Sequence, residues 1–241
     1  MAVRAITFDF WRTLFCEARE PVERRQLRTD AVSRAAGVAP EAAEKALHVA
    51  ESDFLHHHVH QQQTLGPPDA VRIVERELGI RFDANTRLEL AHIFGTAILS
   101  YPPEPIPHAV EAVRAAAERF PIGIISDAGI SPGSSLRQLL DMHGMMPYFR
   151  VLAFSDEVGV SKPQTLMFET AARGLGVGLH ELLHIGDLQA TDIAGAQSIG
   201  SKAALFVGDN DRYRASTTAD FILESWAHFV EWLPGFNPEN G

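Results

Sequence analysis

The chain of 241 residues has one cysteine, Cys16, and no uninterrupted apolar run of about 18 residues, the length that a transmembrane helix needs. A single cysteine excludes an intrachain disulfide and is typical of proteins in a reducing compartment. The first residues also have no long apolar segment of the kind found in signal peptides. We therefore expect a protein without a membrane partner that resides in the cytoplasm.

Basic residues are also scarce. The sequence has 21 Lys and Arg residues against 31 Asp and Glu residues, which gives a formal net charge of −10. No segment concentrates Lys and Arg into a basic strip of the kind that a phosphate backbone attracts. Nucleic acid is therefore not an expected partner.

Short apolar segments alternate with helical segments over most of the chain. Hydrophobic residues make up 46% of the sequence, enough to bury the core of a large domain. The predicted strands are residues 3–8, 121–125, 151–154, 183–185, 203–207 and 221–223. The predicted helices between them are residues 109–119, 134–142, 165–174, 192–198 and 226–233. This alternation predicts an α/β fold with a doubly wound, parallel, Rossmann-like sheet covered by helices on both faces.

Residues 19–100 interrupt this alternation, because they contain no strand-like segment. Four helices are predicted there, at residues 22–36, 41 to about 60, 67–79 and 85–99, with Asp83 or Asn85 as the cap of the last one. A breaker cluster, Tyr101-Pro102-Pro103, follows them and is typical of a hinge. We therefore predict a core domain formed by residues 1–18 and 101–241 and an inserted helical cap formed by residues 19–100. The long apolar cap helices would also allow a homodimer.

Charged and polar residues follow several of the predicted strands or lie in the loops between them. They are Asp9, Ser126, Asp127, Lys162, Asp187 and Asp192. The carboxyl ends of parallel strands meet at one edge of the sheet, so these side chains should gather there. Three carboxylates at one place repel each other unless a divalent cation binds them, and their hard oxygen atoms are ligands that Mg²⁺ prefers. A lysine and a hydroxyl beside them would bind the oxygens of a small anionic substrate.

This set of residues resembles, in order and spacing, the four motifs of the haloacid dehalogenase-like hydrolase superfamily. The segment from Gly186-Asp187 to Asp192 is similar to the fourth motif, and Lys162-Pro163 with Phe168 is similar to the third. The resemblance implies that Asp9 is a nucleophile that takes up a phosphoryl group or an alkyl carbon and is regenerated by water. It also implies that a helical cap opens and closes over the substrate.

The same resemblance assigns roles to individual residues. The implied catalytic residues are Asp9, Ser126 and Lys162. The implied substrate-binding residues are Thr13, Ser126, Asp127 and Lys162. The implied Mg²⁺ ligands are Asp9, the backbone carbonyl of Trp11, Asp187 and, in the first or second coordination shell, Asp192.

Trp11 departs from the family pattern. Phosphatases of the family usually have a second aspartate there, which protonates the leaving group and later activates water, and the next position, Arg12, is most often glycine. Three functions stay open. Retention of the metal motif favours a magnesium-dependent hydrolase of a small phosphomonoester or phosphonate, while an aromatic residue at position 11 favours 2-haloacid dehalogenase chemistry. The third is a binding or regulatory protein that has lost catalysis, and Trp11 would then serve only in packing.

A histidine cluster on the second predicted helix also has two interpretations. His56 and His60 lie four residues apart, which is a spacing that metal sites use, but no acidic or sulfur ligand is at a suitable spacing nearby. We therefore interpret His56, His57, His58 and His60 as solvated or pocket-facing side chains of a cap helix. A further hypothesis is that one of them reaches the cleft and replaces the missing acid. For Cys16 we expect a buried position, because no cationic residue is adjacent to it in the sequence.

Overall fold

The structure is a computed structural model that describes residues 2–16, 21–57 and 61–236. The chain divides into two compact units. The core unit comprises Met1–Ala18, Pro103–Asp127 and Leu140–Gly241, and the helical unit comprises Arg19–Pro102 and Ala128–Leu139. None of the helices in the described residues is both long enough and apolar enough to cross a membrane.

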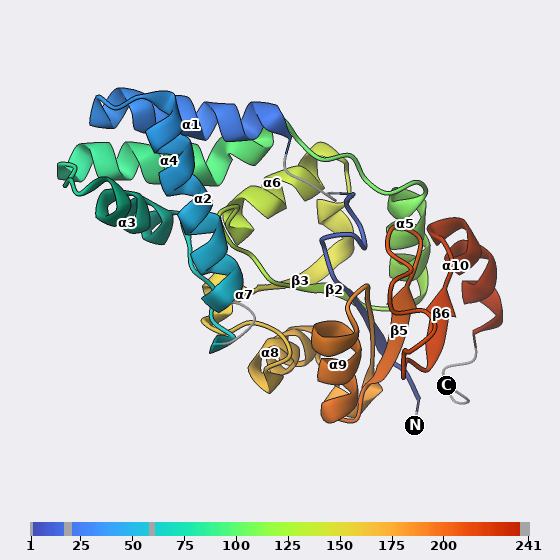
Figure 1. The fold of residues 1–241 in the computed structure, drawn as a ribbon. Helices are drawn as coiled ribbons and strands as arrows, with labels where there is room; N and C mark the ends of the chain where they lie inside the picture. The colour runs from blue at the N-terminus through green and yellow to red at the C-terminus, as the bar shows by residue number, and fades with distance from the viewer. Residues whose placement is uncertain (1, 17–20, 58–60, 237–241) are drawn as a thin grey trace. The chain divides into compact units, whose positions relative to one another are not determined.

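The core unit is built on a six-stranded parallel sheet with the strand order β3-β2-β1-β4-β5-β6 (Figure 1). The strands are β1 (Ala5–Phe8), β2 (Ile122–Ser126), β3 (Phe149–Phe154), β4 (Leu182–Gly186), β5 (Lys202–Phe206) and β6 (Phe221–Leu223). All residues of β1, β2 and β4 are buried, which explains why their sequences are almost continuously apolar. The predicted doubly wound α/β fold is confirmed.

Helices of the core unit cover both faces of this sheet, with α8 and α9 on one face and α5 and α10 on the other (Figure 1). These helices are α5 (Ala109–Arg119), α7 (Ser155–Val158), α8 (Thr165–Leu175), α9 (Ala194–Ser198) and α10 (Trp226–Trp232). The short helix α7 was not predicted. Helix α8 ends one residue later than expected, because Gly176, with a φ of +71°, is its left-handed C-cap.

The helix predicted at residues 192–198 begins differently from the expected form. A π-helical turn at Gln189–Ile193 precedes α9. The backbone N–H of Leu188 donates a hydrogen bond of 2.9 Å to the Asp192 carboxylate, and the N–H of Asp192 donates one of 3.0 Å to the Leu188 carbonyl. Asp192 is therefore fixed by the start of this turn, and π-helical turns are frequent at functional sites.

The helical unit contains four helices at the predicted places, α1 (Val22–Ala36), α2 (Pro40–His56), α3 (Pro67–Leu78) and α4 (Ala84–Ser100). Gly37 and Gly79 end α1 and α3 in the left-handed conformation, as the sequence indicates. The side chain of Asp83 caps α4 by accepting from the backbone N–H groups of Asn85 and Thr86. The predicted extension of α2 to about residue 60 falls partly outside the described residues.

Residues 128–139, which include the first part of α6 (Gly133–Met142), pack with the helical unit. The Ser135 hydroxyl donates a hydrogen bond of 2.8 Å to the carbonyl of Gly95, and Ile130 packs against the apolar core of the four helices. The sequence predicts this segment in the core domain with the rest of residues 101–241, whereas the structure has it in the helical unit. Its apolar pattern predicts a helix, but it does not show which unit the apolar face contacts.

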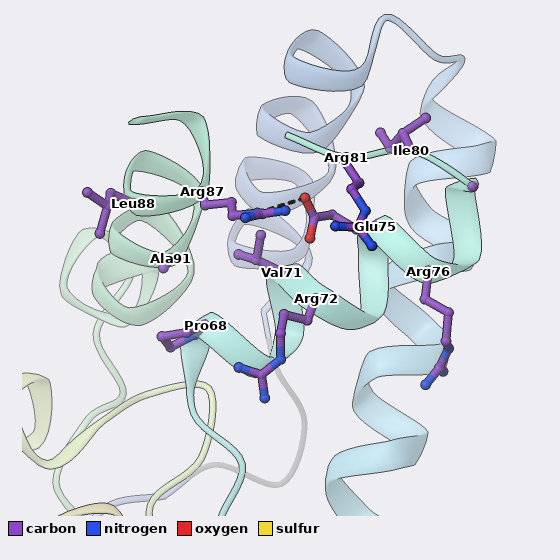
Figure 2. A pocket seen from close by; sticks show the side chains of 11 residues that line it. Pro68, Val71, Arg72, Glu75, Arg76, Ile80, Arg81, Arg87, Leu88 and Ala91 are labelled. Carbon is purple, nitrogen blue, oxygen red and sulfur yellow. Dashed lines mark hydrogen bonds and ion pairs between the residues drawn. The ribbon is translucent and has the colours of Figure 1, made fainter. Parts of the chain in front are cut away.

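The helical unit also has a surface pocket of about 840 Å³ between α3 and α4 (Figure 2). Glu75 is buried at its edge, where its carboxylate accepts hydrogen bonds from the Phe82 backbone N–H at 2.6 Å and from Arg87 Nε at 2.9 Å. Arg72 and Arg76 in the same lining form ion pairs with other acidic residues of the unit. The pair between Arg76 and Asp53 connects α3 to α2, whereas Arg72 pairs with Asp69 within α3.

Candidate active site

The candidate site lies at the carboxyl ends of β1 and β4, where the strand order reverses direction. Asp9 directly follows β1, and its backbone N–H donates a hydrogen bond of 2.8 Å to the Ile185 carbonyl in β4. Asp187 directly follows β4, and Ser126 is the last residue of β2 on the other side of β1. Such a switch point is where open α/β sheets bind their ligands.

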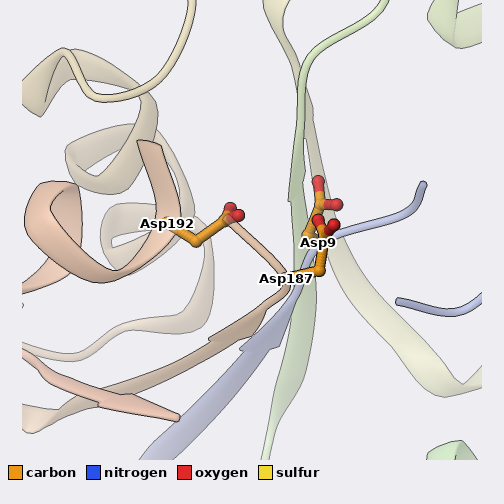
Figure 3. Close-up of side chains that lie close together, drawn as sticks. All are labelled: Asp9, Asp187 and Asp192. Carbon is orange, nitrogen blue, oxygen red and sulfur yellow. The ribbon is translucent and has the colours of Figure 1, made fainter. Parts of the chain in front are cut away.

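Three carboxylates meet at this point. Asp9, Asp187 and Asp192 are 5%, 2% and 0% exposed, and one oxygen atom from each lies within 4.8 Å of the others. Figure 3 shows Asp9 and Asp187 at the ends of their strands, with the carboxylate of Asp192 directed toward them. This group of buried oxygen atoms could hold a metal ion.

Lys162 supplies the positive charge between two of these carboxylates. Its Nζ lies 2.5 Å from Asp9 Oδ1 and 2.6 Å from Asp192 Oδ1, and its side chain is 3% exposed. Burial alone would lower the pKa of Lys162, but the charges of Asp192, Asp9 and Asp127 raise it above its ordinary value. Lys162 is therefore charged at any physiological pH and fixes the position of Asp9.

The carboxyl groups of the cluster differ in how their pKa values are shifted. Burial raises the pKa of Asp9 although Lys162 opposes the shift, and burial together with the charges of Asp9 and Asp192 raises the pKa of Asp187 to about 7. Burial acts in the same direction on Asp192, but Lys162 and His184 hold its pKa well below the usual range. One lysine thus faces three carboxylates, and the negative charge in excess favours uptake of a proton or a cation.

Four buried hydroxyl groups have no hydrogen-bond partner within the described part of the chain, and two of them, Thr13 Oγ1 and Ser126 Oγ, belong to residues predicted to bind the substrate. The loop that carries Thr13 is fixed by Trp226, whose indole N–H donates a hydrogen bond of 2.7 Å to the Thr13 carbonyl. Buried hydroxyls without a partner are uncommon and fit a site where a ligand supplies one. In contrast to these hydroxyls, the Asp127 side chain has a partner within the protein. Its Oδ1 accepts a hydrogen bond of 2.9 Å from the Lys162 backbone N–H.

Two side chains that contact this cluster, His184 and Asn210, are not among the site residues predicted from the sequence. His184, fully buried in β4, has its Nε2 3.1 Å from Asp192 Oδ1 and its Nδ1 3.0 Å from the Thr7 hydroxyl. Asn210, in the loop after β5, donates a hydrogen bond of 3.0 Å to Asp187 Oδ2. A histidine inside an otherwise apolar strand was the one available signal for His184, whereas the sequence contains no comparable signal for Asn210.

A family model described as haloacid dehalogenase-like hydrolase matches residues 3–200. The chain belongs to the haloacid dehalogenase-like hydrolases. The match includes both units, and the resemblance seen in the sequence motifs is confirmed.

The curated relatives of this haloacid dehalogenase-like hydrolase include a nucleotidase and several phosphatases by name. Pyrimidine 5′-nucleotidase YjjG of Escherichia coli (strain K12) is 35% identical over 130 residues, which cover 54% of this chain and 56% of that protein. Phosphoglycolate phosphatase of Yersinia pseudotuberculosis (serotype I, strain IP32953) is 33% identical over 121 residues, 49% of each chain. The chain thus spans about half the length of the curated relatives that it matches.

Solved structures of two kinds share the fold of this hydrolase. A 2-haloacid dehalogenase from Pseudomonas syringae pv. Tomato DC3000 has a TM-score of 0.74 and 22% identity, and the match covers 97% of this chain and 99% of that one. A phosphatase of the same superfamily from Thermococcus onnurineus has a TM-score of 0.67 and 21% identity, with 98% and 100% covered. At these identities the likeness shows a shared fold and leaves the reaction open.

In this hydrolase Gly186 packs closely against Asp192, and a substitution at Gly186 tests this contact. A Cβ atom on Gly186 would lie 2.6 Å from the Cβ of Asp192, so Gly186→Ala must displace that residue and the lysine it binds. We expect a loss of stability of about 1–3 kcal/mol and a loss of hydrolytic activity of about 100-fold. Urea unfolding and steady-state kinetics measure the two effects. Gly235→Ala is the control, because its added Cβ would meet no atom within 4 Å, and equal behaviour of the two variants would contradict the proposed packing.

The predicted histidine cluster lies only partly in the described residues. His56 is exposed, and His57 is partly buried with its Nδ1 2.8 Å from a backbone carbonyl one turn earlier in α2. His58 and His60 lie outside the described residues, so the interpretation of the cluster as solvated side chains stays a prediction.

Proposed function

We propose that the protein hydrolyses small phosphomonoesters or phosphonates in a magnesium-dependent reaction, with Asp9 as the nucleophile. The observation that supports this proposal best is the cluster of three buried carboxylates, whose oxygens lie within 4.8 Å of one another, with Lys162 bound to Asp9 and Asp192. The hydroxyls of Thr13 and Ser126, unpartnered in the described part of the chain, are the candidates for contacts with the substrate. Such a site attracts a divalent cation and has hydroxyl donors for the oxygens of a bound phosphoryl group.

In this proposal each residue has one role. Asp9 Oδ2 attacks phosphorus while Lys162 holds Oδ1 at 2.5 Å, and the bond from phosphorus to the leaving group breaks as the leaving group departs as an anion. Water then hydrolyses the aspartyl phosphate, which releases phosphate and regenerates Asp9. The Ser126 and Thr13 hydroxyls donate to the phosphoryl oxygens, and Lys162 balances part of their charge. Asp127 holds the Lys162 backbone in place, and its predicted direct contact with the substrate stays part of the proposal.

The residues present fit Mg²⁺, because their donors are hard carboxylate oxygens within 4.8 Å of one another. Asp9 and Asp187 are the proposed ligands, with the Trp11 backbone carbonyl as a third. Asp192 is better suited to an indirect role, since Oδ1 already binds Lys162 and His184 and Oδ2 accepts from the Leu188 N–H. When bound, Mg²⁺ would neutralise charge on the phosphoryl oxygens.

Trp11 bears on which substrates this site can hydrolyse. Its indole cannot donate the proton that a poor leaving group requires, and its position is the one where phosphatases of the family usually have an acid. The proposal therefore includes a preference for substrates whose leaving groups depart without protonation. The aromatic residue and the fold shared with 2-haloacid dehalogenases favour carbon–halogen hydrolysis as the second candidate.

A substrate panel distinguishes the two candidates and the loss of catalysis. Phosphomonoesters of graded leaving-group pKa, phosphonates and 2-haloacids are incubated with the wild-type protein, with Mg²⁺ or with a chelator. The proposal expects phosphate release that requires Mg²⁺ and is fastest for the most acidic leaving groups. Halide release that persists in chelator would establish the dehalogenase instead. No turnover on the whole panel, together with ligand-induced thermal stabilisation, would indicate a binding protein.

The raised pKa of Asp187 predicts how magnesium stabilises the fold at different pH values. An acid whose pKa rises from its ordinary 3.8 to about 7 on folding contributes stability that is complete below about pH 4 and is lost as the pH rises through about 7. Magnesium bound to the ionised carboxylate offsets this loss. The increase in Tm caused by Mg²⁺ should therefore be larger at about pH 8 than at about pH 5.5. Equal increases at both pH values, or an unchanged pH dependence in Asp187→Asn, would contradict this prediction.

A further inference from the structure

The loop after β5 contacts two parts of the candidate active site through consecutive residues. Asp209 binds Arg12 and Cys16 in the loop that follows Asp9, and Asn210 binds Asp187 at the end of β4. All of these residues belong to the core unit. One short segment therefore connects the loop after the proposed nucleophile to a proposed metal ligand.

The contact between Asn210 and Asp187 has a defined direction. Asn210 Nδ2 donates to Asp187 Oδ2 at 3.0 Å, and Asn210 Oδ1 accepts from the Arg212 backbone N–H at 3.2 Å. Because the amide oxygen has a backbone donor, the amide nitrogen is the end that faces the carboxylate. This hydrogen bond fixes the orientation of the Asp187 carboxylate, whose Oδ1 and remaining lone pair on Oδ2 can face a cation.

The contacts of Asp209 hold this segment in place. Arg12 donates twice, from Nε to Asp209 Oδ2 at 2.8 Å and from a terminal nitrogen to the Asp209 carbonyl at 3.1 Å. Cys16, which the sequence led us to expect as buried, is exposed, and its Sγ donates to Asp209 Oδ1 at 3.0 Å. Arg12 adopts a φ of +55°, a conformation that costs free energy for a non-glycine residue. The ion pair with Asp209 is therefore a contact that glycine at this position would lack.

We propose that Asn210 is a positioning residue that orients Asp187 for cation binding. We also propose that the Arg12–Asp209 pair holds Asn210 within hydrogen-bond distance of Asp187. The inference rests on the proposed function, because it assigns a role toward the proposed magnesium site. Neighbours of metal ligands fix the orientation of the ligand and typically change metal affinity by about 10- to 100-fold when they are replaced. Asn210 acts only through Asp187, so its removal should weaken the metal site and leave the chemistry of Asp9 intact.

The test measures cation binding directly and without substrate. Mn²⁺ is titrated into wild type, Asn210→Ala and Arg12→Gly, with free Mn²⁺ followed by its electron paramagnetic resonance signal. We expect the Kd for Mn²⁺ to rise about 10- to 100-fold in Asn210→Ala and by a smaller factor in Arg12→Gly. In Mg²⁺-dependent turnover, Asn210→Ala should need more metal for half-saturation but regain the wild-type kcat when metal is saturating.

A double variant and a control separate positioning from general damage to the loop. If Arg12 acts through Asn210, Arg12→Gly in the Asn210→Ala background should cause no further loss of Mn²⁺ affinity. Arg212→Ala removes an exposed side chain of the same loop while its backbone N–H remains, and it should bind Mn²⁺ as wild type does. Thermal unfolding in chelator checks that all variants are folded.

The outcomes distinguish this inference from the proposed function. Unchanged Mn²⁺ affinity in Asn210→Ala, with binding intact in the wild type, overturns the role of Asn210 and leaves the proposed function standing. Additive losses from Arg12→Gly and Asn210→Ala overturn the link through Asp209. A wild-type protein that binds neither Mn²⁺ nor Mg²⁺ overturns both the inference and the proposed metal dependence.

Discussion

Asp9→Asn is expected to reduce phosphate release by about 10⁴-fold or more, because loss of a covalent nucleophile has effects of this order in other enzymes. The replacement keeps the shape of the side chain, and asparagine Oδ1 can still accept the hydrogen bond that Lys162 donates at 2.5 Å. What is lost is the negative oxygen that would attack phosphorus. Initial rates at saturating Mg²⁺, on the best substrate of the panel, measure the effect.

A matched variant shows whether the loss of activity in Asp9→Asn is caused by the missing nucleophile. Asp127→Asn also removes one carboxylate charge near Lys162, but asparagine keeps an oxygen that can accept the hydrogen bond from the Lys162 backbone N–H. It should keep far more activity than Asp9→Asn. The nucleophile assignment fails if Asp9→Asn retains activity within about tenfold of wild type, or if both variants lose activity equally.

The sheet could be predicted because its strands are buried on both faces and separated by helices. Segments such as Ala5–Phe8 and Ile122–Ser126 are short, almost entirely apolar and followed at once by polar residues. Their order and the crossover rule then determine where the carboxyl ends meet. This reasoning brings Asp9, Asp187 and Asp192 to one place, and the structure has them within 4.8 Å.

The remaining contacts of the site depend on geometry that a sequence does not display. Asn210 reaches Asp187 because the loop after β5 folds back over the end of β4, and loop direction depends on contacts such as the one between Arg12 and Asp209. His184 contacts Asp192 because a π-helical turn directs that carboxylate toward the sheet. Such turns have no reliable sequence pattern, so the predicted start of a regular helix at residue 192 differed from the structure.

Lys162→Met tests the electrostatic core of the site and is expected to have the second largest effect. Methionine is of similar length and removes the positive charge that lies 2.5 Å from Asp9 and 2.6 Å from Asp192. Removing one member of a buried ion pair costs about 3–5 kcal/mol, because the remaining charge is left without a partner. We also expect a loss of activity of about 10²- to 10³-fold, the order seen when a donor to the developing negative charge is removed.

The pH dependence of this destabilisation separates an electrostatic role of Lys162 from simple packing. Without the lysine, burial and the charge of Asp192 raise the pKa of Asp9 further above its usual range, because the charge of Lys162 no longer opposes them. A raised acid pKa stabilises the folded state below the unfolded pKa, and this contribution is lost as the pH rises through the folded value. The gap in unfolding free energy between wild type and Lys162→Met should therefore be wider at about pH 8 than at about pH 5.

Mg²⁺ should narrow this gap in unfolding free energy at the higher pH, because a cation bound by Asp9 and Asp187 would relieve the repulsion between their carboxylates. Urea unfolding at both pH values, with and without Mg²⁺, measures the gap, and a gap that is independent of pH would mean that Lys162 contributes volume and not charge.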